Sequence, residues 1–238
     1  MRILVVNDDG ITSEGIIRLA AMAAKLGEVW VVAPDAQCSA MSQKITIRGD
    51  INVKQADFPV AAVNAYSVSG TPADCVKIAL DYLMPEPPDI VFSGINYGYN
   101  CGYDILYSGT VGAAWEALRS GIPAIAFSKE MNDVYDVVDE HILSIAKELL
   151  DNMPATSEIW NVNFPGCTLD ELQGIIWDAK IAPMEFYADH YEREENPDGS
   201  FSLTLTGDPI TTAPEGTDIR YVIDRYISIG KIKSNIIQ

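Results

Sequence analysis

The sequence predicts an α/β fold with a doubly wound, mostly parallel sheet and a C-terminal antiparallel extension or arm. Over residues 1–165, apolar runs rich in β-branched residues, typical of strands buried on both faces, alternate with segments of helical period. Residues 200–206 and 226–232 instead alternate in period two, as hairpin strands do. We therefore divide the chain into a Rossmann-like core, residues 1–165, and a C-terminal extension or oligomerisation arm of the same domain, residues 166–238.

The first elements predict a βαβ unit. Residues 2–6 are expected to form a buried strand, and Thr12 and Ser13 are candidate N-caps for a helix that runs to Leu26. Residues 29–33 are expected to form a second buried strand. Such a unit joins parallel strands through a right-handed crossover.

The middle of the chain departs from this rhythm and then returns to it. Residues 45–51 and 60–68 alternate in period two, which predicts a small antiparallel element. A helix is expected from Pro72, capped by Thr71, to Leu83. The remaining core elements are expected as strands at 88–92, 123–127 and 159–164, helices at 111–119 and 137–152, and a Gly/Asn-rich loop at 93–108.

The composition excludes several classes of partner. A net charge of −18 argues against a nucleic-acid duplex or an anionic membrane. The apolar runs are far shorter than the ~20 residues of a membrane span. The four cysteines show no CxxC spacing and read as reduced thiols, and no signal-peptide pattern follows Met1. These features favour a cytoplasmic protein.

The composition also restricts the kind of metal site. The two histidines, His141 and His190, are expected at the surface, so a His-rich zinc site is excluded. A metal would be bound through oxygens, which favours Mg²⁺ or Mn²⁺. Residues 131–238 carry a net charge of −13, against −5 for residues 1–130. An anionic substrate would therefore need a bound cation to reverse the local field.

Two polar clusters follow predicted strands, at the edge where open α/β sheets bind ligands. In the Asn-Asp-Asp-Gly sequence at 7–10, the carboxylates of Asp8 and Asp9 repel each other, and a dication is the simplest means of keeping both ionised. Alternatively, one caps the next helix and the other is solvated. Ser93 and Asn96 follow another strand and offer neutral oxygens to a hard cation, unless they simply form a turn.

A third cluster, Ser108, Gly109 and Thr110, directly precedes a predicted helix. The N–H groups at a helix N-terminus suit a phosphate group, although Ser and Thr also cap helices without binding a ligand. Neither a GxxxxGKS/T loop nor a GxGxxG fingerprint follows any strand, so nucleoside-triphosphate and dinucleotide sites of those types are not predicted.

Two further groups of residues are weaker candidates. Ser39 lies in the loop after the second strand, from which it can reach the end of the first strand. Four tyrosines near the second cluster either line a nucleobase pocket by stacking or anchor loops on the surface. They are Tyr97, Tyr99, Tyr103 and Tyr107.

Taken in order, these motifs resemble the SurE (stationary-phase survival protein) family of metal-dependent nucleoside-monophosphate phosphatases. The resemblance rests on Ser39 and on separated strings: NDDGI at 7–11, VVAPD at 31–35, GTPADCVKIAL at 70–80, SGINYGYNCGYDILYSGTVGAAWEA at 93–117 and NVNFP at 161–165. It covers nearly the whole chain, and the string at 93–117 is the most specific. Chance agreement in so many ordered pieces is implausible.

The resemblance implies a site and a substrate class. It implies one Mg²⁺ or Mn²⁺ ion per subunit, hydrolysis of nucleoside 5′- and 3′-monophosphates, and homodimers or homotetramers built through exchanged C-terminal arms. Asp8, Asp9, Ser39 and Asn96 match the metal ligands, and Ser108, Gly109 and Thr110 match the phosphate-side loop. Asn96 is also expected to bind the phosphate of the substrate.

The sequence departs from the family pattern at a few positions. Cys38 stands where a basic residue is frequent, and Ala40 and Ala117 stand where glycine is common. The last segment reads YISIGKI where the family usually has a YVSITPL-like string. The departure at Cys38 bears on substrate affinity and the last on arm exchange, and none alters the expected ligands.

The expected mechanism is in-line attack on phosphorus by a metal-activated water. Asp8 is assigned as a ligand, and Asp9 as a ligand and candidate general base. The alternative mechanism forms a covalent aspartyl-phosphate. Alternative functions are a catalytically inactive nucleotide-binding protein and a phosphoacceptor receiver domain. The latter needs a further aspartate at the end of the third parallel strand, and Asp57 does not follow a buried strand.

Overall fold

The computed structural model describes residues 1–234 and places most of them around one mixed sheet. In chain order its strands are Arg2–Val6 (β1), Glu28–Pro34 (β2), Val53–Gln55 (β3), Asn64–Val68 (β4), Ile90–Tyr97 (β5), Ala124–Lys129 (β6), Glu158–Phe164 (β7), Gly174–Ile176 (β8) and Tyr226–Lys233 (β11). A separate hairpin is formed by Tyr187–Glu195 (β9) and Phe201–Pro209 (β10). The helices are Glu14–Ala23 (α1), Pro72–Ile78 (α2), Gly109–Arg119 (α3), Asp136–Asp151 (α4) and Asp218–Ile223 (α5), with a π turn at Ala79–Leu83 (η1) and a 3₁₀ turn at Gly102–Leu106 (η2).

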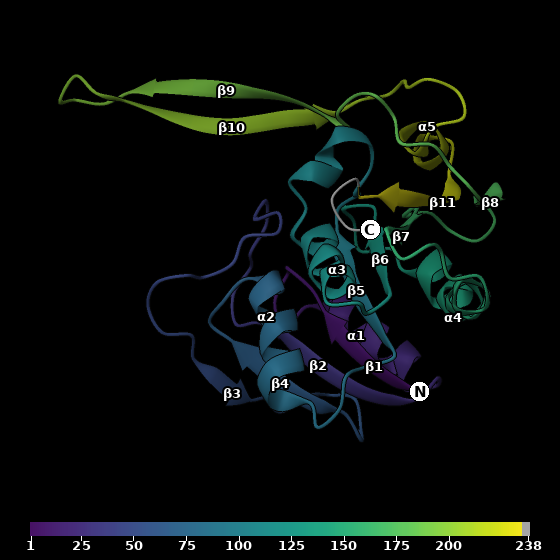
Figure 1. The fold of residues 1–238 in the computed structure, drawn as a ribbon. Coiled ribbons are helices and arrows are strands. Elements are labelled where there is room, and N and C mark those ends of the chain that lie inside the picture. The colour runs from purple at the N-terminus through teal and green to yellow at the C-terminus, as the bar shows by residue number, and fades with distance from the viewer. Residues whose placement is uncertain (235–238) are drawn as a thin grey trace.

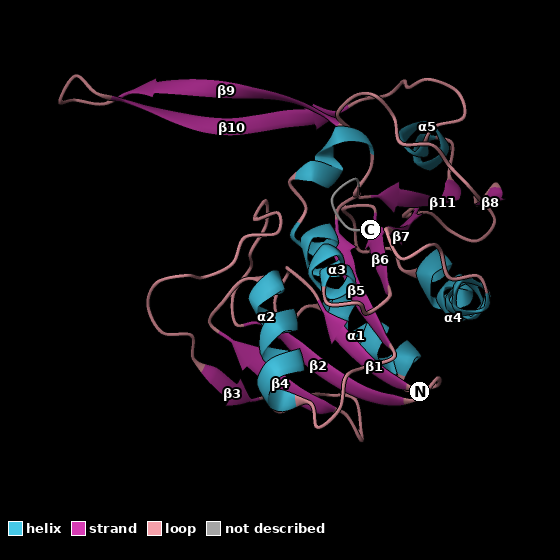
Figure 2. Ribbon diagram, viewed as in Figure 1, coloured by secondary structure: helices cyan, strands magenta, loops and turns pink. Residues whose placement is uncertain are grey.

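The order of the strands places β1 at the topological switch point. The nine-stranded sheet runs β3-β4-β2-β1-β5-β6-β7-β11-β8, and β1 pairs in parallel with β2 on one side and β5 on the other. Helices α1 and α4 pack on one face, and α2 and α3 on the other (Figures 1 and 2). The doubly wound, mostly parallel fold predicted from the sequence is confirmed. Ligands in such sheets bind at the carboxyl ends of the strands beside the switch point.

The middle segment differs from the sequence prediction. Residues 45–51 form no strand, and the hydroxyl and backbone N–H of Thr46 are bound by the side chain of Asp74 instead of by a strand partner. Strand β4 pairs in parallel with β2 and so belongs to the main sheet, while β3 adds to it in antiparallel fashion at the edge. The hydrophobic periodicity of a sequence does not reveal that a backbone N–H is hydrogen-bonded by a distant carboxylate.

Strand β5 is longer than its apolar run indicates, because it continues to Tyr97 through the predicted Gly/Asn-rich loop. Its pairing with β6 shifts register between Ser93 and Asn96, which pairs with Ser128. Gly94 lies in this irregularity with φ +133°, and a Cβ there would come 2.2 Å from the carbonyl oxygen of Phe127. Asn96 is therefore held in a strand beside the end of β1.

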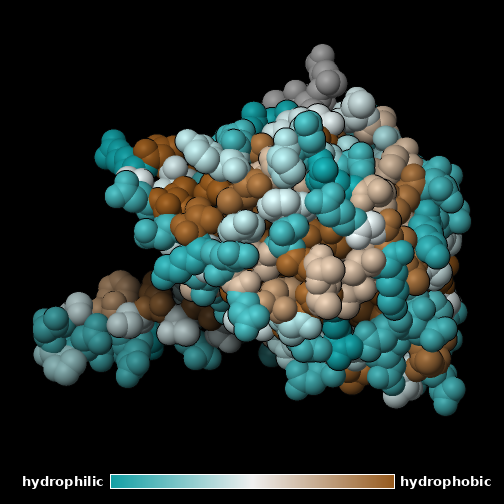
Figure 3. Space-filling view, turned by 90° about the horizontal axis from the view of Figure 1, so that it is seen from below, coloured by the Kyte–Doolittle hydropathy of each residue, from teal (hydrophilic) through white to brown (hydrophobic). Residues whose placement is uncertain are grey.

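The two period-two segments of the C-terminal part have different fates. Residues 201–209 form the hairpin with β9, and this hairpin stands clear of the rest of the molecule (Figures 1 and 3). Residues 226–233 instead enter the main sheet as β11, antiparallel to β7 and parallel to β8, with Ile227 and Ile229 fully buried. No helix within residues 1–234 has the length and apolar character needed to span a bilayer.

Candidate active site

Asp8 follows β1 and is the most enclosed of the candidate ligands, with an exposed fraction of 3%. The hydroxyl of Thr110 donates a hydrogen bond of 2.6 Å to its Oδ1 atom. The pKa of Asp8 is raised from 3.8 to about 6, chiefly by burial; the Thr110 hydrogen bond opposes this rise, and the negative charge of Asp9 adds to it. A buried carboxylate in this state favours a positive partner.

The first turn of α3 approaches Asp8 at Gly109. A Cβ built on Gly109 would come 2.9 Å from the Cβ and Oδ2 atoms of Asp8, so a larger residue would displace the carboxylate or the helix. Ser108 caps α3, because its hydroxyl accepts a hydrogen bond from the backbone N–H of Val111. The positive end of the helix dipole is thereby placed beside Asp8.

Asp9 differs from its neighbour because it is partly exposed and lines an open pocket. Its Oδ2 atom accepts a 2.9 Å hydrogen bond from the backbone N–H of Tyr97, at the end of β5. Burial raises the pKa of Asp9, and hydrogen bonds from Tyr97 and Gln37 partly offset this effect. The two carboxylates thus have different access to solvent although they are adjacent in sequence.

Asn7 fixes the turn that carries both aspartates. Its amide nitrogen donates to the carbonyl oxygen of Gly10 and to the hydroxyl of Ser13, at 3.0 and 2.8 Å. Its Oδ1 atom is buried and has no hydrogen-bond partner within the described part of the chain. Buried acceptors are rarely left unsatisfied, so this oxygen indicates that the end of β1 is completed by another group.

The loop that carries Ser39 is joined to β1 through its backbone. The N–H of Cys38 donates a 2.7 Å hydrogen bond to the carbonyl oxygen of Asp8, and the next residue, Ser39, is exposed. Ala40 and Ser42 have φ angles of +55° and +50°, a conformation that costs free energy in residues other than glycine. The loop therefore needs tethers to hold this shape.

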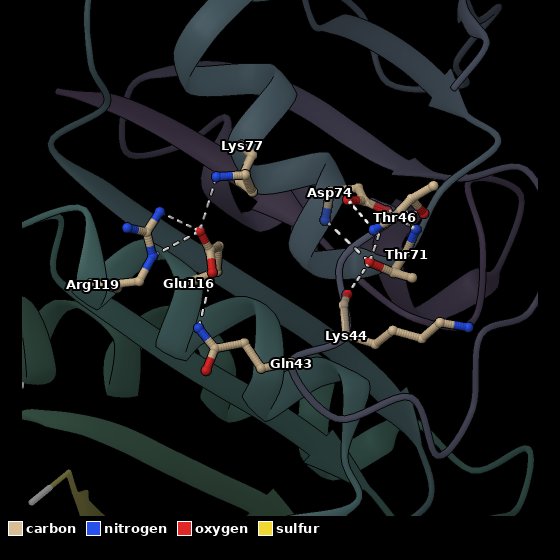
Figure 4. Close-up of polar contacts among 8 residues, drawn as sticks. All are labelled: Gln43, Lys44, Thr46, Thr71, Asp74, Lys77, Glu116 and Arg119. Atoms are coloured by element: carbon tan, nitrogen blue, oxygen red, sulfur yellow. Dashed lines mark hydrogen bonds and ion pairs between the residues drawn. The ribbon is translucent and has the colours of Figure 1, made fainter. Parts of the chain in front are cut away.

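Two buried carboxylates supply these tethers (Figure 4). Asp74, on α2, accepts hydrogen bonds from the backbone N–H and hydroxyl of Thr46 and from Thr71, which lower its pKa despite the effect of burial. Glu116, on α3, accepts a 2.9 Å hydrogen bond from the amide of Gln43. The loop from residue 35 to residue 51 is therefore fastened to both helices on that face of the sheet.

Glu116 is also surrounded by cations. Arg119 lies 2.6 Å and Lys77 3.8 Å from its Oε1 atom, and its side chain is only 4% exposed (Figure 4). These partners keep the carboxylate ionised, and its pKa is lowered although burial alone would raise it. An ionised Glu116 is a strong acceptor for the amide of Gln43.

The oxygens around Asp8 suit a hard cation. Within residues 1–234, no three His, Cys, Asp or Glu side chains are grouped to hold a metal, so a cation here would depend on Asp8 and Asp9 together with neutral oxygens. Asn96 is fixed through its nitrogen, which donates to the carbonyl oxygen of Gly98 at 2.8 Å and leaves Oδ1 available. Such a donor set matches Mg²⁺ or Mn²⁺ and not zinc.

A family model described as Survival protein SurE matches residues 3–184. The chain belongs to the SurE family. It is 40% identical over 235 residues to a 5′-nucleotidase SurE of Clostridium botulinum (96% of this chain, 91% of the relative) and 37% identical over 236 residues to one of Thermosipho melanesiensis (98% and 91%). A crystal structure of the SurE protein from Aquifex aeolicus superposes with a TM-score of 0.83 at 33% identity, covering 99% of this chain and 96% of the other.

In this SurE-family protein the structure brings some, but not all, of the predicted site residues into direct contact. Direct contacts join Asp8, Asp9, Gly109 and Thr110 to one another or to the end of β5, and Asn96 and Ser39 are each next in sequence to a residue that is hydrogen-bonded to one of the aspartates. The Thr110 hydroxyl is committed to Asp8, a contact that sequence reasoning missed. His190 is exposed on β9 and His141 is partly buried on α4, and both lie outside the site.

Sequence reasoning also missed Asp74 and Glu116. One signal was present for Asp74, because a Thr-x-x-Asp sequence at the start of a helix is a capping box, which the structure shows between Thr71 and Asp74. Nothing in the sequence indicated that the same carboxylate also binds Thr46, 28 residues away.

Proposed function

We propose that this SurE-family protein is a divalent-metal-dependent phosphatase that hydrolyses nucleoside 5′- and 3′-monophosphates. The observation that carries the proposal is the buried carboxylate of Asp8, which meets the N-terminus of α3 while Asp9 beside it opens to a pocket. Negative ligands for a cation and N–H groups for an anion are thus side by side. The relatives described as 5′-nucleotidases support the choice of nucleotides as substrates.

We assign the cation, Mg²⁺ or Mn²⁺ with one ion per subunit, to Asp8, Asp9, Ser39 and Asn96. When bound, such an ion neutralises charge on phosphoryl oxygens and lowers the pKa of an attacking water. Asp8 is held for this role by Thr110, whose hydroxyl fixes one carboxylate oxygen. The phosphoryl group is assigned to Ser108, Gly109 and Thr110, where backbone N–H groups at the start of α3 can stabilise its charge.

Asp9 is the better candidate for the general base. It lines the open pocket, whereas Asp8 is enclosed and already accepts the Thr110 hydroxyl. A base must reach the proton that it removes, which requires access to the substrate side of the site. In the rival mechanism an aspartate attacks phosphorus and releases the nucleoside, and water then attacks phosphorus and releases the aspartate. Those two in-line displacements retain the configuration at a chiral phosphorus, whereas direct attack by water inverts it. Retention measured with a chirally labelled phosphate ester would therefore exclude direct attack by water.

The experiment for the proposed function is a phosphate-release screen over nucleoside 5′- and 3′-monophosphates with Mg²⁺ or Mn²⁺. EDTA is expected to abolish release, and either ion is expected to restore it. Asp8→Asn is expected to fold but to lose several kcal/mol of transition-state stabilisation, which is measured as a fall in kcat/KM. Activity that survives chelation would contradict the metal assignment.

A receiver domain is a poorer alternative. Asp57 follows β3, the edge strand of the sheet, and is exposed, with β4 and β2 between β3 and β1. A phosphoacceptor would have to lie beside the acidic pair at the end of β1. Asp57 therefore cannot share a cation with Asp8 and Asp9 in this fold.

We further propose that the protein forms homodimers, or homotetramers built from them, through the β9–β10 hairpin. Phe201, Leu203 and Leu205 alternate along β10 and so share one face, and Leu205 pairs directly with Tyr191 on β9. Each of these four side chains is at least 50% exposed. A two-stranded hairpin is marginally stable alone in water, so a second subunit that covers this face would stabilise it.

A further inference from the structure

We propose that the pocket beside Asp9 receives the nucleoside of the substrate, with the base stacked on the ring of Tyr97. The inference rests on the proposed function, because it names the part of the substrate that lies next to the phosphoryl group. The pocket has a volume of about 510 Å³. Small-molecule sites usually span about 300–1,000 Å³, so a mononucleoside fits this space.

The pocket is lined by Asp9 and by four other segments of the chain. Helix α1, the loop after β2, the end of β5 and the segment between β6 and α4 each contribute a wall. Besides Asp9, their charged, amide and aromatic side chains are Glu14, Arg18, Gln37, Tyr97, Asp133 and Tyr135. Because Asp9 lies both in the acidic pair and in the pocket wall, a ligand bound here is adjacent to the proposed phosphoryl site.

Tyr97 is the only one of the four candidate tyrosines that lines this pocket. Tyr97 is 41% exposed, and its backbone N–H donates to the Oδ2 atom of Asp9. Tyr99 is buried and packs edge-to-face against Phe186, with ring centroids 5.2 Å apart. Tyr107 lines a different pocket at the root of the hairpin. An exposed aromatic face next to the acidic pair is what a stacking base requires.

Two cations contact the rings of the aromatic wall. The ammonium of Lys129 lies 5.2 Å from the ring centroid of Tyr97 and 4.5 Å from that of Tyr135, and the guanidinium of Arg18 lies 4.3 Å from the latter. Lys129 is 1% exposed and donates to the backbone oxygens of Glu130 and Asn132. A ring fixed in this way loses little conformational entropy when a base stacks on it.

The charges of the pocket orient the ligand. Asp9, Glu14 and Asp133 place three carboxylates on its walls against the single guanidinium of Arg18, which already pairs with Glu14 at 2.7 Å. A phosphate group would be repelled from the interior unless a cation were bound at the acidic pair. Ribose hydroxyls and exocyclic amino groups can instead donate to these carboxylates, so the nucleoside end enters the pocket.

The experiment compares Tyr97→Ala and Tyr97→Phe with AMP and with ribose 5-phosphate, which has no base. The ratio of kcat/KM for AMP to that for ribose 5-phosphate is expected to fall about tenfold or more in Tyr97→Ala, because stacking contributes about 1–3 kcal/mol per base. Tyr97→Phe keeps the ring and is expected to keep the ratio within about twofold. Tyr82→Ala is the matched control, since Tyr82 is 88% exposed on η1.

Calorimetric binding of adenosine, which has no phosphate to be hydrolysed, separates this inference from the proposed function. An unchanged ratio and an unchanged adenosine affinity in a folded Tyr97→Ala would overturn the pocket while leaving the phosphatase in place. Adenosine binding that depends on the Tyr97 ring, without phosphate release from AMP by the unmodified protein, would support the pocket and contradict the activity. If the unmodified protein neither binds adenosine nor releases phosphate, both proposals are contradicted.

Discussion

Asp8 illustrates how burial can prepare a residue for a ligand. Its exposed fraction is 3%, its pKa is raised to about 6, and its neighbours are a hydroxyl, a helix N-terminus and a second carboxylate. Adjacent Asp9 has the same chemistry but an open side. Different roles for two identical side chains follow from this difference in environment.

The pH dependence of stability should reveal the free-energy cost of burying the ionised Asp8 carboxylate. Because its folded pKa is raised from 3.8, a bound proton stabilises the metal-free protein at low pH, and this contribution is lost as pH rises through about 6. The full shift corresponds to about 3 kcal/mol. In EDTA, Asp8→Asn is therefore expected to raise Tm by several degrees at pH 8 and by less at pH 5. Thermal unfolding at both pH values measures this.

Divalent cations provide the second half of the same measurement. At pH 8, Mg²⁺ or Mn²⁺ is expected to raise the Tm of the unmodified protein, since an ion that binds only the folded state stabilises it. The same addition is expected to leave the Tm of Asp8→Asn nearly unchanged. An Asp8→Asn protein that is less stable than the unmodified protein in EDTA at pH 8 would contradict a destabilising effect of the ionised Asp8 carboxylate.

Thr110 offers a test of positioning at the same scale. Thr110→Val removes the hydroxyl that donates to Asp8 but keeps the shape of the side chain. Loss of a hydrogen bond to a metal ligand typically costs about 10- to 100-fold in metal affinity or activity. Titration of activity against Mg²⁺ or Mn²⁺ should show this loss in Thr110→Val, whereas Thr110→Ser, which retains the hydroxyl, should stay close to the unmodified protein.

At the scale of elements, the loop from residue 35 to residue 51 is positioned by side chains and not by regular structure. It contains no strand or helix, and its attachments are Asp74 and Glu116 on the two helices beside it (Figure 4). Residues 40 and 42 adopt left-handed φ angles. The position of Ser39 therefore depends on buried carboxylates that lie outside the site.

Asp74→Ala is expected to release this loop. It removes the acceptor for Thr46 and Thr71, so the free energy of unfolding should fall by about 1–3 kcal/mol, and the half-saturating metal concentration should rise because Ser39 is no longer held. Denaturant unfolding and a metal titration of activity measure the two effects. Asp81→Ala, on neighbouring η1, is the control. A fall in stability with no change in metal dependence would separate the loop from the ligand set.

On the scale of the whole molecule, contacts within one chain do not cover the apolar side chains of the β9–β10 hairpin. It projects from the body (Figure 3), and four large apolar side chains are exposed on it. Its root packs against a small third cluster formed by Tyr99, Phe186 and residues of α5. The hairpin is thus anchored at one end and open at the other, as an element that joins two subunits would be.

Replacing the middle of that face should dissociate the assembly. Leu203→Lys is expected to shift the protein from dimer or tetramer to monomer in light scattering coupled to size exclusion, because a positive charge opposite Arg193 cannot be buried in the proposed interface without a partner. Thr204→Lys, on the opposite face of the same strand and across from Glu192, is the matched control. A monomeric unmodified protein at micromolar concentration would contradict the proposed assembly.

The sequence by itself determined the elements that short-range patterns encode. Buried apolar runs predicted the strands of the core, and the polar residues after them marked Asp8, Asp9 and the start of α3 as neighbours, because carboxyl ends of parallel strands share one edge. The ordered motifs also indicated the family, which the comparisons confirm. Asp8 and Asp9 lie at the switch point of the sheet, where they accept hydrogen bonds from Thr110 and Tyr97 respectively.

Only the tertiary structure decided what depends on contacts between distant segments. Strand β11 joins the main sheet although its alternation matches that of the hairpin, since the open edge of β7 accepts it. Thr110 serves Asp8, and one tyrosine of four faces the pocket, because the register shift in β5 sets where Tyr97 points. Periodicity records which face is buried, but not which partner buries it, and that partner is chosen by packing across the whole chain.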